Sequence, residues 1–296
     1  MEYRGKILLF GEHIVVQGAQ ALARPVPAFH GHWAFGPPDA SPAHPLHDWL
    51  HYLSGLQSAA ALEVTLDLAR FERDLHHGLF FDSNIPLGYG AGSSGALCAA
   101  LYDAYALNPP DKTNTRLFPA IRADLGKIES YFHGASSGAD PLVSYLDQPL
   151  LFDRGQAVRP VSLPEPNPRY TLFLLDTGHA RKTGPLVQQF QAKMREPQFH
   201  DLVLAELIPA TEDAIQCYVQ GNWEALFEIW ALISYFQYRY MQEWILPDWH
   251  QAWLDSLAGP QQRLKICGAG GGGFILGITR DWTFTQAAFG KKAIAL

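Results

Sequence analysis

The chain has 296 residues, of which 48% are hydrophobic and 17% charged. At about 150 residues per domain, this length predicts two domains or one large one, and the hydrophobic share is enough for a buried core. The formal net charge is −7, from 22 Lys and Arg against 29 Asp and Glu. A chain this acidic lacks the broad basic surface of a nucleic-acid-binding protein, so a bound anion must be attracted locally, by backbone N–H groups or a few cations.

The three cysteines, Cys98, Cys217 and Cys267, lie far apart and form no CxxC pair. This odd number argues against a disulfide framework and a thiolate zinc site, and it predicts a reducing cytoplasm as the location. The N-terminus has no signal-peptide pattern. The longest uncharged stretch, residues 83–102, is rich in glycine in its first half, so we expect no membrane span.

In the first half of the chain, apolar runs predict short strands. They cover residues 6–10, with an apolar continuation at 14–16, then 62–69 and 79–81. Residues 28–47 are rich in Pro, Gly and His and predict turns and short strands. An alanine- and leucine-rich helix is expected over 94–107, ended by Asn108 and two prolines, and further helices over 115–132 and 140–145.

Residues 160–168 contain several Pro and Asn residues and are interpreted as a linker. The expected domains are therefore residues 1–165 and 166–296. In the second domain the patterns predict strands at 170–175, 264–267 and 274–278. Helices are expected over 186–195, over 203–220 with a break at Pro209, and over 223–244 with Asn222 as N-cap.

A glycine-rich loop, PLGYGAGSSG from Pro86 to Gly95, runs directly into the first of these helices. The first N–H groups of a helix are unpaired and its dipole adds partial positive charge, while glycines let a ligand approach the backbone. The loop therefore predicts a phosphate-binding site. Residues 90–95 also fit GxGxxG, but they do not open an N-terminal βαβ unit, so that match is weak.

Two further segments contain residues suited to ligand binding or catalysis. Residues 268–273 hold five glycines in six positions, preceded by Lys265, which favours close approach of the backbone to a ligand or to the first loop. Glu129 and Asp140 flank the small-residue segment HGASSG. Two carboxylates near a phosphate site suggest a division of roles, one binding Mg²⁺ and the other accepting a proton.

Three segments in this order, GKILLFGEH, PLGYGAGSSGA and KICGAGGGG, resemble the motifs of the GHMP kinases. Within that superfamily the N-terminal segment GKILLFGEHIVVQG and the segment SGAD are most similar to those of mevalonate kinases. The resemblance implies a two-domain α+β GHMP fold with the active site between the domains. It also implies an ATP-dependent, Mg²⁺-requiring kinase of the isoprenoid precursor pathway that phosphorylates mevalonate to 5-phosphomevalonate.

Position by position, the resemblance implies that Asp140 accepts the substrate hydroxyl proton and that Lys6 orients this hydroxyl. Ser94 and Glu129 match the Mg²⁺ ligands. The residues implied to bind ATP are Pro86, Gly88, Gly90, Ala91, Gly92, Ser93 and Ser94. Those implied to bind the acceptor are Glu12, His13, Asp140, Thr177 and Gly270.

The chain departs from the family at Gly95, where alanine is usual and glycine is expected to loosen the helix start, and over residues 234–244. The acceptor therefore stays open between mevalonate, phosphomevalonate, a sugar and a homoserine-like alcohol. The expected partners are the small substrate and ATP, with a homodimer left open and no nucleic acid or membrane.

Two hypotheses other than a catalytically active kinase remain open. His30 and His32 form an HxH pair, and His44, His47 and His51 are spaced to share a helix face, so a histidine-rich metal-binding protein is one alternative. The other is a catalytically inactive GHMP-fold binding protein, against which the presence of Lys6, Glu129 and Asp140 argues.

Overall fold

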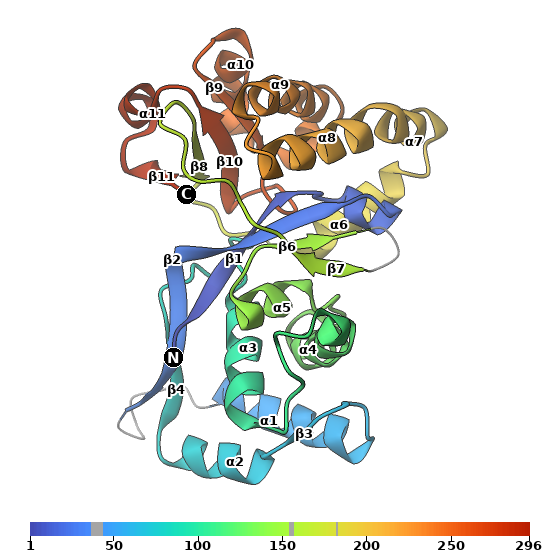
Figure 1. The fold of residues 1–296 in the computed structure, drawn as a ribbon, viewed down its shortest axis with the longest axis vertical. Helices are drawn as coiled ribbons and strands as arrows, with labels where there is room; N and C mark the ends of the chain where they lie inside the picture. The colour runs from blue at the N-terminus through green and yellow to red at the C-terminus, as the bar shows by residue number, and fades with distance from the viewer. Residues whose placement is uncertain (37–43, 154–156, 182) are drawn as a thin grey trace. The chain divides into compact units, whose positions relative to one another are not determined.

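A computed structural model describes residues 1–36, 44–153, 157–181 and 183–296. The chain forms two compact units (Figure 1). Unit 1 comprises Met1–Lys6, Arg24–Pro86 and Ala91–Gln148; unit 2 comprises Ile7–Ala23, Leu87–Gly90 and Pro149–Leu296. The expected domains, residues 1–165 and 166–296, stay a prediction. The division into compact units is not linear along the chain. The reason is that the strands β1 (Tyr3–Phe10) and β2 (Ala21–Phe35) each contribute residues to both units.

In unit 1, the second half of β2 pairs antiparallel with β4 (Leu79–Ser83), from Gly31 opposite Ser83 to Phe35 opposite Leu79. A short pair joins β3 (Thr65–Leu66) to β5 (Ala106–Leu107). The helices are α1 (His44–Ser58), α2 (Leu68–His76), α3 (Ser93–Tyr105), α4 (Phe118–His133) and α5 (Ala139–Leu146), with a 3₁₀ turn at Thr115–Leu117.

Helix α3 is the buried centre of unit 1, packed against α4 and α5 (Figure 1). Ala96, Ala99, Ala100 and Leu101 of α3 are inaccessible, and large aromatic side chains such as Trp49, Phe71 and Phe118 complete the core. Small residues along α3 allow this close packing of helices. The start of α3 is therefore held on a rigid support.

In unit 2, four strands form an antiparallel sheet in the order β11-β8-β10-β9. They are β8 (Thr171–Asp176), β9 (Gln262–Ile266), β10 (Phe274–Thr279) and β11 (Ala293–Ala295). The first residues of β2 pair with β6 (Leu150–Phe152), which pairs with β7 (Val158–Pro160).

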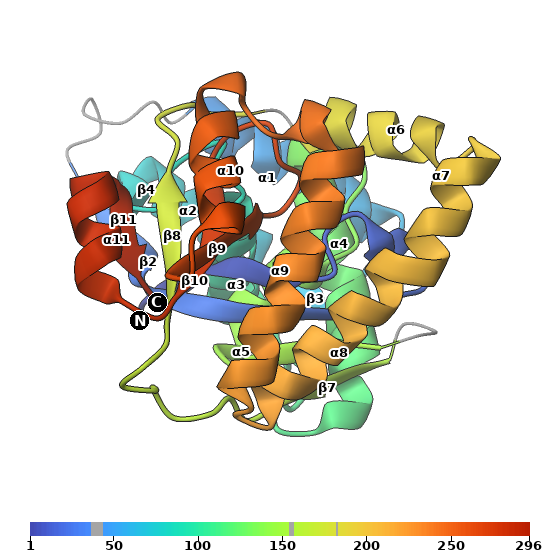
Figure 2. The ribbon, with the colours of Figure 1, turned by 90° about the horizontal axis from the view of Figure 1, so that it is seen from above.

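The helices of unit 2 are α6 (Thr183–Lys193), α7 (Pro197–Leu202), α8 (Ile208–Val219), α9 (Trp223–Tyr240), α10 (His250–Ala258) and α11 (Trp282–Phe289), with 3₁₀ turns at Gln242–Trp244, Pro247–Trp249 and Gly290–Lys292. Figure 2 shows α8 and α9 side by side beyond β9, and α11 at the β11 end of the sheet. Within the described residues, no helix is long and apolar enough to cross a membrane.

Most of the expected elements are confirmed, and three expectations are wrong. Residues 14–16 lie in a 3₁₀ turn, Ile14–Gln17, because the chain turns sharply at His13. Residues 28–35 continue the long strand β2 rather than forming turns. Residues 62–69 contain only the two-residue β3, because Asp67 caps α2 by accepting a hydrogen bond from the Arg70 N–H at 3.0 Å.

The helical expectations in unit 2 were more accurate. Asn222 caps α9 as expected, its side chain accepting from the Ala225 N–H, although α9 ends at Tyr240 rather than at 244. The expected break near Pro209 is present: a π-helical turn, Val203–Leu207, separates α7 from α8, and Pro209 lies in the first turn of α8. Helices α1 and α2 of unit 1 and α7, α10 and α11 of unit 2 were not anticipated.

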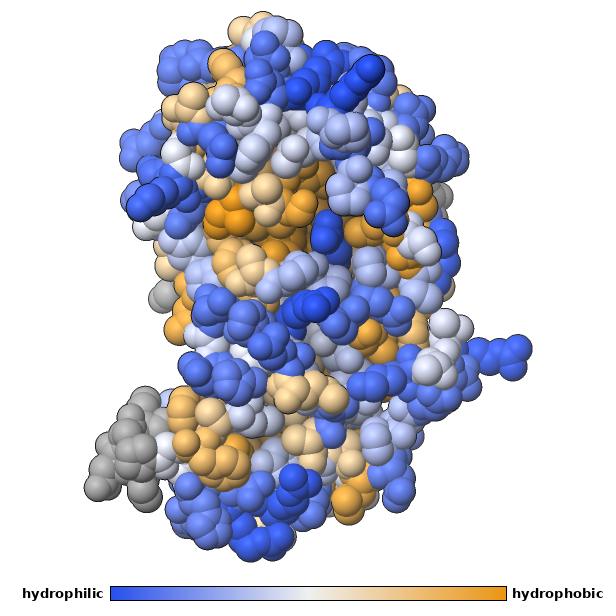
Figure 3. Space-filling view, turned by 60° about the vertical axis from the view of Figure 1, so that its left-hand side comes forward, coloured by the Kyte–Doolittle hydropathy of each residue, from blue (hydrophilic) through white to orange (hydrophobic). Residues whose placement is uncertain are grey.

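The surface is mixed. Figure 3 shows a face on which hydrophilic side chains predominate and apolar ones gather in patches, one of them in a hollow. Scattered apolar residues such as Leu87 and Leu232 are exposed. Such exposure is a normal property of protein surfaces and by itself assigns no function.

Candidate active site

In unit 1, the start of α3 is held close to β1. Gly92 is the N-cap of α3 with φ +77°, and the Lys6 N–H donates to the Ala91 carbonyl at 2.8 Å. A Cβ atom at Gly92 would lie 2.9 Å from Lys6 Cγ. Only glycine satisfies both the left-handed backbone and this contact. The unpaired N–H groups at the start of α3 are therefore placed next to a buried lysine.

That lysine pairs with the predicted catalytic aspartate. Lys6 Nζ lies 2.9 Å from Asp140 Oδ2; the Lys6 side chain is 8% exposed and that of Asp140 42%. Asp140 is in the first turn of α5, which begins after Gly138 (φ +70°). A buried ammonium at this distance fixes the carboxylate and keeps one of its oxygens occupied. The remaining carboxylate surface is open to accept a proton.

Glu129, on α4, is buried and bonded by two serines. Ser94 Oγ donates to Glu129 Oε1 at 2.9 Å, and Ser136 Oγ donates to Oε2. Burial, reinforced by the charge of Asp140, raises the pKa of Glu129 to about 7, while the two serine hydrogen bonds and Lys6 act in the opposite direction. The structure thus brings the two predicted Mg²⁺ ligands into direct contact.

The donor set suits Mg²⁺. A serine hydroxyl and a carboxylate are hard oxygen ligands, and Mg²⁺ is usually held by one or two such groups together with water and phosphate oxygens. Ser94 Oγ also lies 2.9 Å from His133 Nε2. Neither His133 nor Ser136 was assigned a role from the sequence, although both lie in the HGASSG segment.

The alternative histidine site finds no support in the described residues, where no group of three or more His, Cys, Asp or Glu side chains could hold a metal ion. His47 packs against His76, with ring centroids 5.7 Å apart. The side chain of His44 lies outside the described part of the chain.

In unit 2, the first half of the glycine-rich loop is anchored by Arg181. The Arg181 N–H donates to the Gly88 carbonyl at 2.9 Å. Its guanidinium donates from Nη1 to the Gly270 carbonyl at 2.8 Å. The next loop residue, Tyr89, packs edge-on against Phe274 with ring centroids 5.1 Å apart. The predicted residues Gly88, Gly90 and Gly270 thus share one neighbour that the sequence did not single out.

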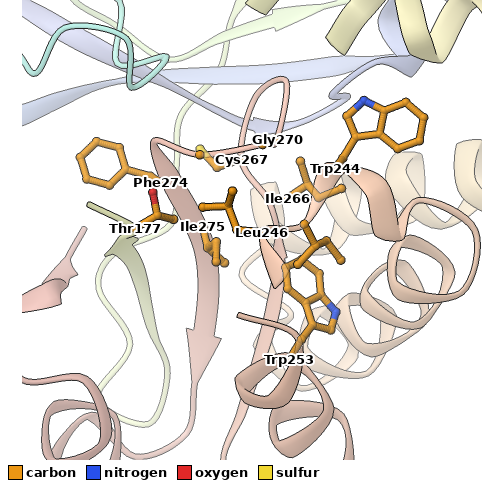
Figure 4. A pocket seen from close by; sticks show the side chains of 12 residues that line it. Thr177, Trp244, Leu246, Trp253, Ile266, Cys267, Gly270, Phe274 and Ile275 are labelled. Carbon is orange, nitrogen blue, oxygen red and sulfur yellow. The ribbon is translucent and has the colours of Figure 1, made fainter. Parts of the chain in front are cut away.

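Thr177 and Gly270 line a small, mainly apolar pocket in unit 2 (Figure 4). Thr177 Oγ1 donates to the Gly273 carbonyl at 2.7 Å. Gly270 has φ +72°, and a Cβ there would lie 2.7 Å from the Trp244 carbonyl oxygen. The other walls are Trp244, Ile245, Leu246, Trp253, Ile266, Cys267, Gly271, Gly272, Phe274 and Ile275. The pocket therefore offers a tight apolar surface with one hydroxyl.

His13 occupies a strained turn. It has φ +64° and ψ −44°, and the Ile14 N–H donates to the Glu12 carbonyl at 2.7 Å, the pattern of a γ-turn. Its ring stacks on Phe190 at 4.8 Å and meets Trp244 edge-on at 5.8 Å. Burial lowers the pKa of His13 to about 4. The nearby cations Arg181 and Lys265 lower this pKa further, whereas a hydrogen bond with the backbone of Ala269 acts in the opposite direction. The imidazole is neutral at pH 7.

The Glu12 carboxylate pairs with the buried Lys265 ammonium. Lys265 also donates to its neighbour's carbonyl, at Ile266, at 2.9 Å, and its Nζ lies 5.6 Å from the centre of the Phe10 ring. A buried carboxylate needs such a partner. Glu12, predicted to bind substrate, is thus engaged in an internal ion pair, and Lys265 is a second residue whose role the sequence did not reveal.

The predicted site residues divide between the units. Unit 1 holds Lys6, Pro86, Ala91, Gly92, Ser93, Ser94, Glu129 and Asp140, and it brings Lys6 to Asp140 and Ser94 to Glu129. Unit 2 holds Glu12, His13, Gly88, Gly90, Thr177 and Gly270.

Comparison with known proteins supports the predicted resemblance and the fold. Residues 54–148 match the family model of the GHMP kinases N terminal domain. The chain is 18% identical to L. major mevalonate kinase in complex with R-mevalonate, with a TM-score of 0.67 over 99% of this chain and 94% of that one. It is 15% identical to Streptococcus pneumoniae phosphomevalonate kinase, with a TM-score of 0.63 over 100% and 98%. The chain has the GHMP kinase fold, and the predicted resemblance to that superfamily is confirmed.

Within the superfamily, the curated relatives are mevalonate kinases. One, from Thermococcus onnurineus, is 31% identical over 172 residues, which are 51% of this chain and 50% of the relative. Another, from Thermococcus sibiricus, is 27% identical over 232 residues, 71% of this chain and 66% of the relative. The matched part of the chain thus spans about half of the first relative's length and about two thirds of the second's.

Proposed function

We propose that the chain is an ATP-dependent kinase that transfers the γ-phosphate of ATP to the hydroxyl of a small alcohol. The observation that carries this proposal is the Lys6–Asp140 pair, 2.9 Å apart at the start of α3. The Ser94–Glu129 hydrogen bond in the same unit supports it. A general base, a cation, a helix N-terminus and a hard-oxygen ligand pair are what phosphoryl transfer requires of a protein.

Each group has a defined task in this proposal. The N–H groups at the start of α3 and the backbone of Ala91, Gly92 and Ser93 bind phosphate oxygens. Asp140 accepts the proton of the acceptor hydroxyl, and Lys6 holds that carboxylate in place. Ser94 and Glu129 would hold Mg²⁺, which offsets negative charge on the phosphate oxygens.

Mevalonate is the acceptor we propose. Both curated relatives are mevalonate kinases, and the N-terminal segment through Glu12 and His13 resembles the mevalonate kinase motif. Phosphomevalonate is the second candidate, because the chain has a comparable structural match to a phosphomevalonate kinase.

The domain division proposed from the sequence, residues 1–165 and 166–296, applies to this function as the N- and C-terminal GHMP domains. The N-terminal family model ends at residue 148, before the proposed boundary.

A coupled assay of ADP release with ATP and Mg²⁺ tests the proposal directly. Mevalonate, phosphomevalonate, homoserine and several sugars are compared at equal concentrations. We expect mevalonate to give the highest kcat/KM. ADP release with phosphomevalonate and with none of the other alcohols would make phosphomevalonate the acceptor, and the proposed kinase activity would stand. Nucleotide binding without turnover on any alcohol would favour an inactive binding protein instead.

A further inference from the structure

Arg181 connects the two glycine-rich segments of unit 2. Its backbone N–H donates to Gly88 in the first segment, at 2.9 Å, and its Nη1 donates to Gly270 in the second, at 2.8 Å. A charged donor bonded to a carbonyl is stronger than a neutral one. One residue therefore fixes the separation of these two flexible backbones.

The guanidinium also fills the space that glycines leave open. A Cβ at Gly90 would overlap Arg181 Nη2, and a Cβ at Gly268 would lie 2.6 Å from the same atom. Both glycines have positive φ, +71° and +58°. The absence of side chains at these positions thus admits the guanidinium between the two segments.

The glycine-rich backbone of residues 88–90 needs a contact that holds it in one conformation. Glycines at positive φ have wide conformational freedom, and holding them in one conformation costs entropy that other contacts must offset. Tyr89 supplies part of this through Phe274 and through a hydrogen bond to Asp176, which together with burial raises its pKa. These contacts hold a side chain, whereas the two hydrogen bonds of Arg181 hold the backbone itself.

We propose that Arg181 is a positioning residue that holds residues 88–90 in the conformation that binds the phosphates of a nucleoside polyphosphate. The nucleotide part rests on the proposed kinase function. The restraint itself is a property of the free protein.

The binding experiment compares wild type with Arg181→Ala and Arg181→Lys by calorimetric titration with ADP and Mg²⁺. Loss of a hydrogen bond from a charged group should weaken binding by about 10- to 100-fold in Arg181→Ala. Lysine lacks the planar guanidinium group with its several N–H donors, so Arg181→Lys should recover little of the lost ADP affinity. Millimolar guanidinium should restore part of the affinity of Arg181→Ala, because it can enter the vacated space. Arg195→Ala, at an exposed arginine on the same unit, is the control and should bind as wild type.

Amide hydrogen exchange tests the positioning role of Arg181 independently of the proposed kinase function, because it is measured without nucleotide. Both Arg181 variants keep the backbone N–H that donates to the Gly88 carbonyl but lose the guanidinium. Without added nucleotide, we therefore expect faster amide exchange than in wild type in peptides covering 268–272, which lose the bond to Gly270, and in peptides covering 87–90, which lose the contact at Gly90. Arg195→Ala should show no change. Wild type that binds no nucleotide would refute the kinase proposal but leave this readout valid. Equal exchange in wild type and in both Arg181 variants, or equal ADP affinity, would overturn the positioning role. Arg181→Lys provides the measurement if Arg181→Ala does not fold.

Discussion

Gly95 of α3 lies against Asp140 of α5 so closely that a methyl group on Gly95 would be 2.9 Å from the Asp140 carbonyl carbon and 3.2 Å from its Cβ. From the sequence alone, glycine at this position suggested only a looser helix start. The structure shows that the space of a side chain is occupied by the backbone that carries the proposed catalytic base. The position of Asp140 relative to Lys6 therefore depends on the absence of a side chain at residue 95.

Gly95→Ala should lower kcat by roughly 10-fold or more, because α5 must shift and small displacements of catalytic groups are costly. The variant should also be less stable, because the cost of overpacking, about 1–3 kcal/mol, outweighs the gain in helix propensity of about 1 kcal/mol. Steady-state kinetics and thermal unfolding measure both effects. The control is Gly55→Ala in α1, where a Cβ meets nothing within 4 Å and should stabilise the protein. Equal stabilisation by both substitutions with unchanged kcat would contradict this explanation.

Asp140→Asn should lower kcat by about 100-fold or more while ADP affinity is retained, because an amide cannot accept the proton. Asp147→Asn, at the other end of α5, is the matched control, since asparagine tolerates its positive φ of +49°. Rapid-quench kinetics separates the chemical step from product release. Normal turnover by Asp140→Asn would remove this residue from the mechanism.

Glu129→Gln should raise the Mg²⁺ concentration needed for half-maximal activity, because it removes a charged ligand but keeps hydrogen-bonding capacity toward Ser94 and Ser136. Titration of ADP binding with Mg²⁺ gives the same information without turnover. Glu72→Gln, on the exposed face of α2, should leave both curves unchanged. An unaltered Mg²⁺ titration in Glu129→Gln would count against the metal assignment.

Lys265→Met should reduce the free energy of unfolding by about 3–5 kcal/mol, because it removes the buried ammonium that pairs with the buried Glu12 carboxylate. The double variant Lys265→Met/Glu12→Gln should regain much of this loss, since the buried carboxylate charge that Lys265 balanced is also removed. Urea denaturation measures the three proteins. A double variant as unstable as Lys265→Met alone would show that packing of the lysine stem, rather than the ion pair, is responsible.

His13 should make stability depend on pH. Its folded-state pKa of about 4 lies below the ordinary value of 6.5. The neutral, buried form is therefore favoured above pH 6.5, and this contribution is lost as the pH falls from about 6.5 towards 4, up to about 3 kcal/mol in total. Denaturation curves across this range should show a shallower pH dependence in His13→Asn than in wild type. His77→Gln, at an exposed histidine, should keep the wild-type slope.

Local patterns were sufficient for much of the fold. The alanine-rich run of α3, the Asn222 cap of α9 and the glycine-separated strands β9 and β10 are encoded by neighbouring residues, and each was predicted close to its observed bounds. The long strand β2 was not, because it is held at its two ends by pairing with β6 and β4, and pairing partners distant in sequence leave no local pattern.

The sequence by itself predicted the resemblance to the GHMP kinases, through three glycine- and motif-rich segments whose residue types and order are visible without coordinates. It also placed Lys6, Ser94, Glu129 and Asp140 among the residues to examine. Only the tertiary structure decided that Lys6 contacts Asp140, that Glu12 is paired with Lys265, and that Arg181 joins two glycine segments. Contacts between residues about 90 to 250 positions apart depend on how helices and strands pack, and composition and spacing carry no record of that packing.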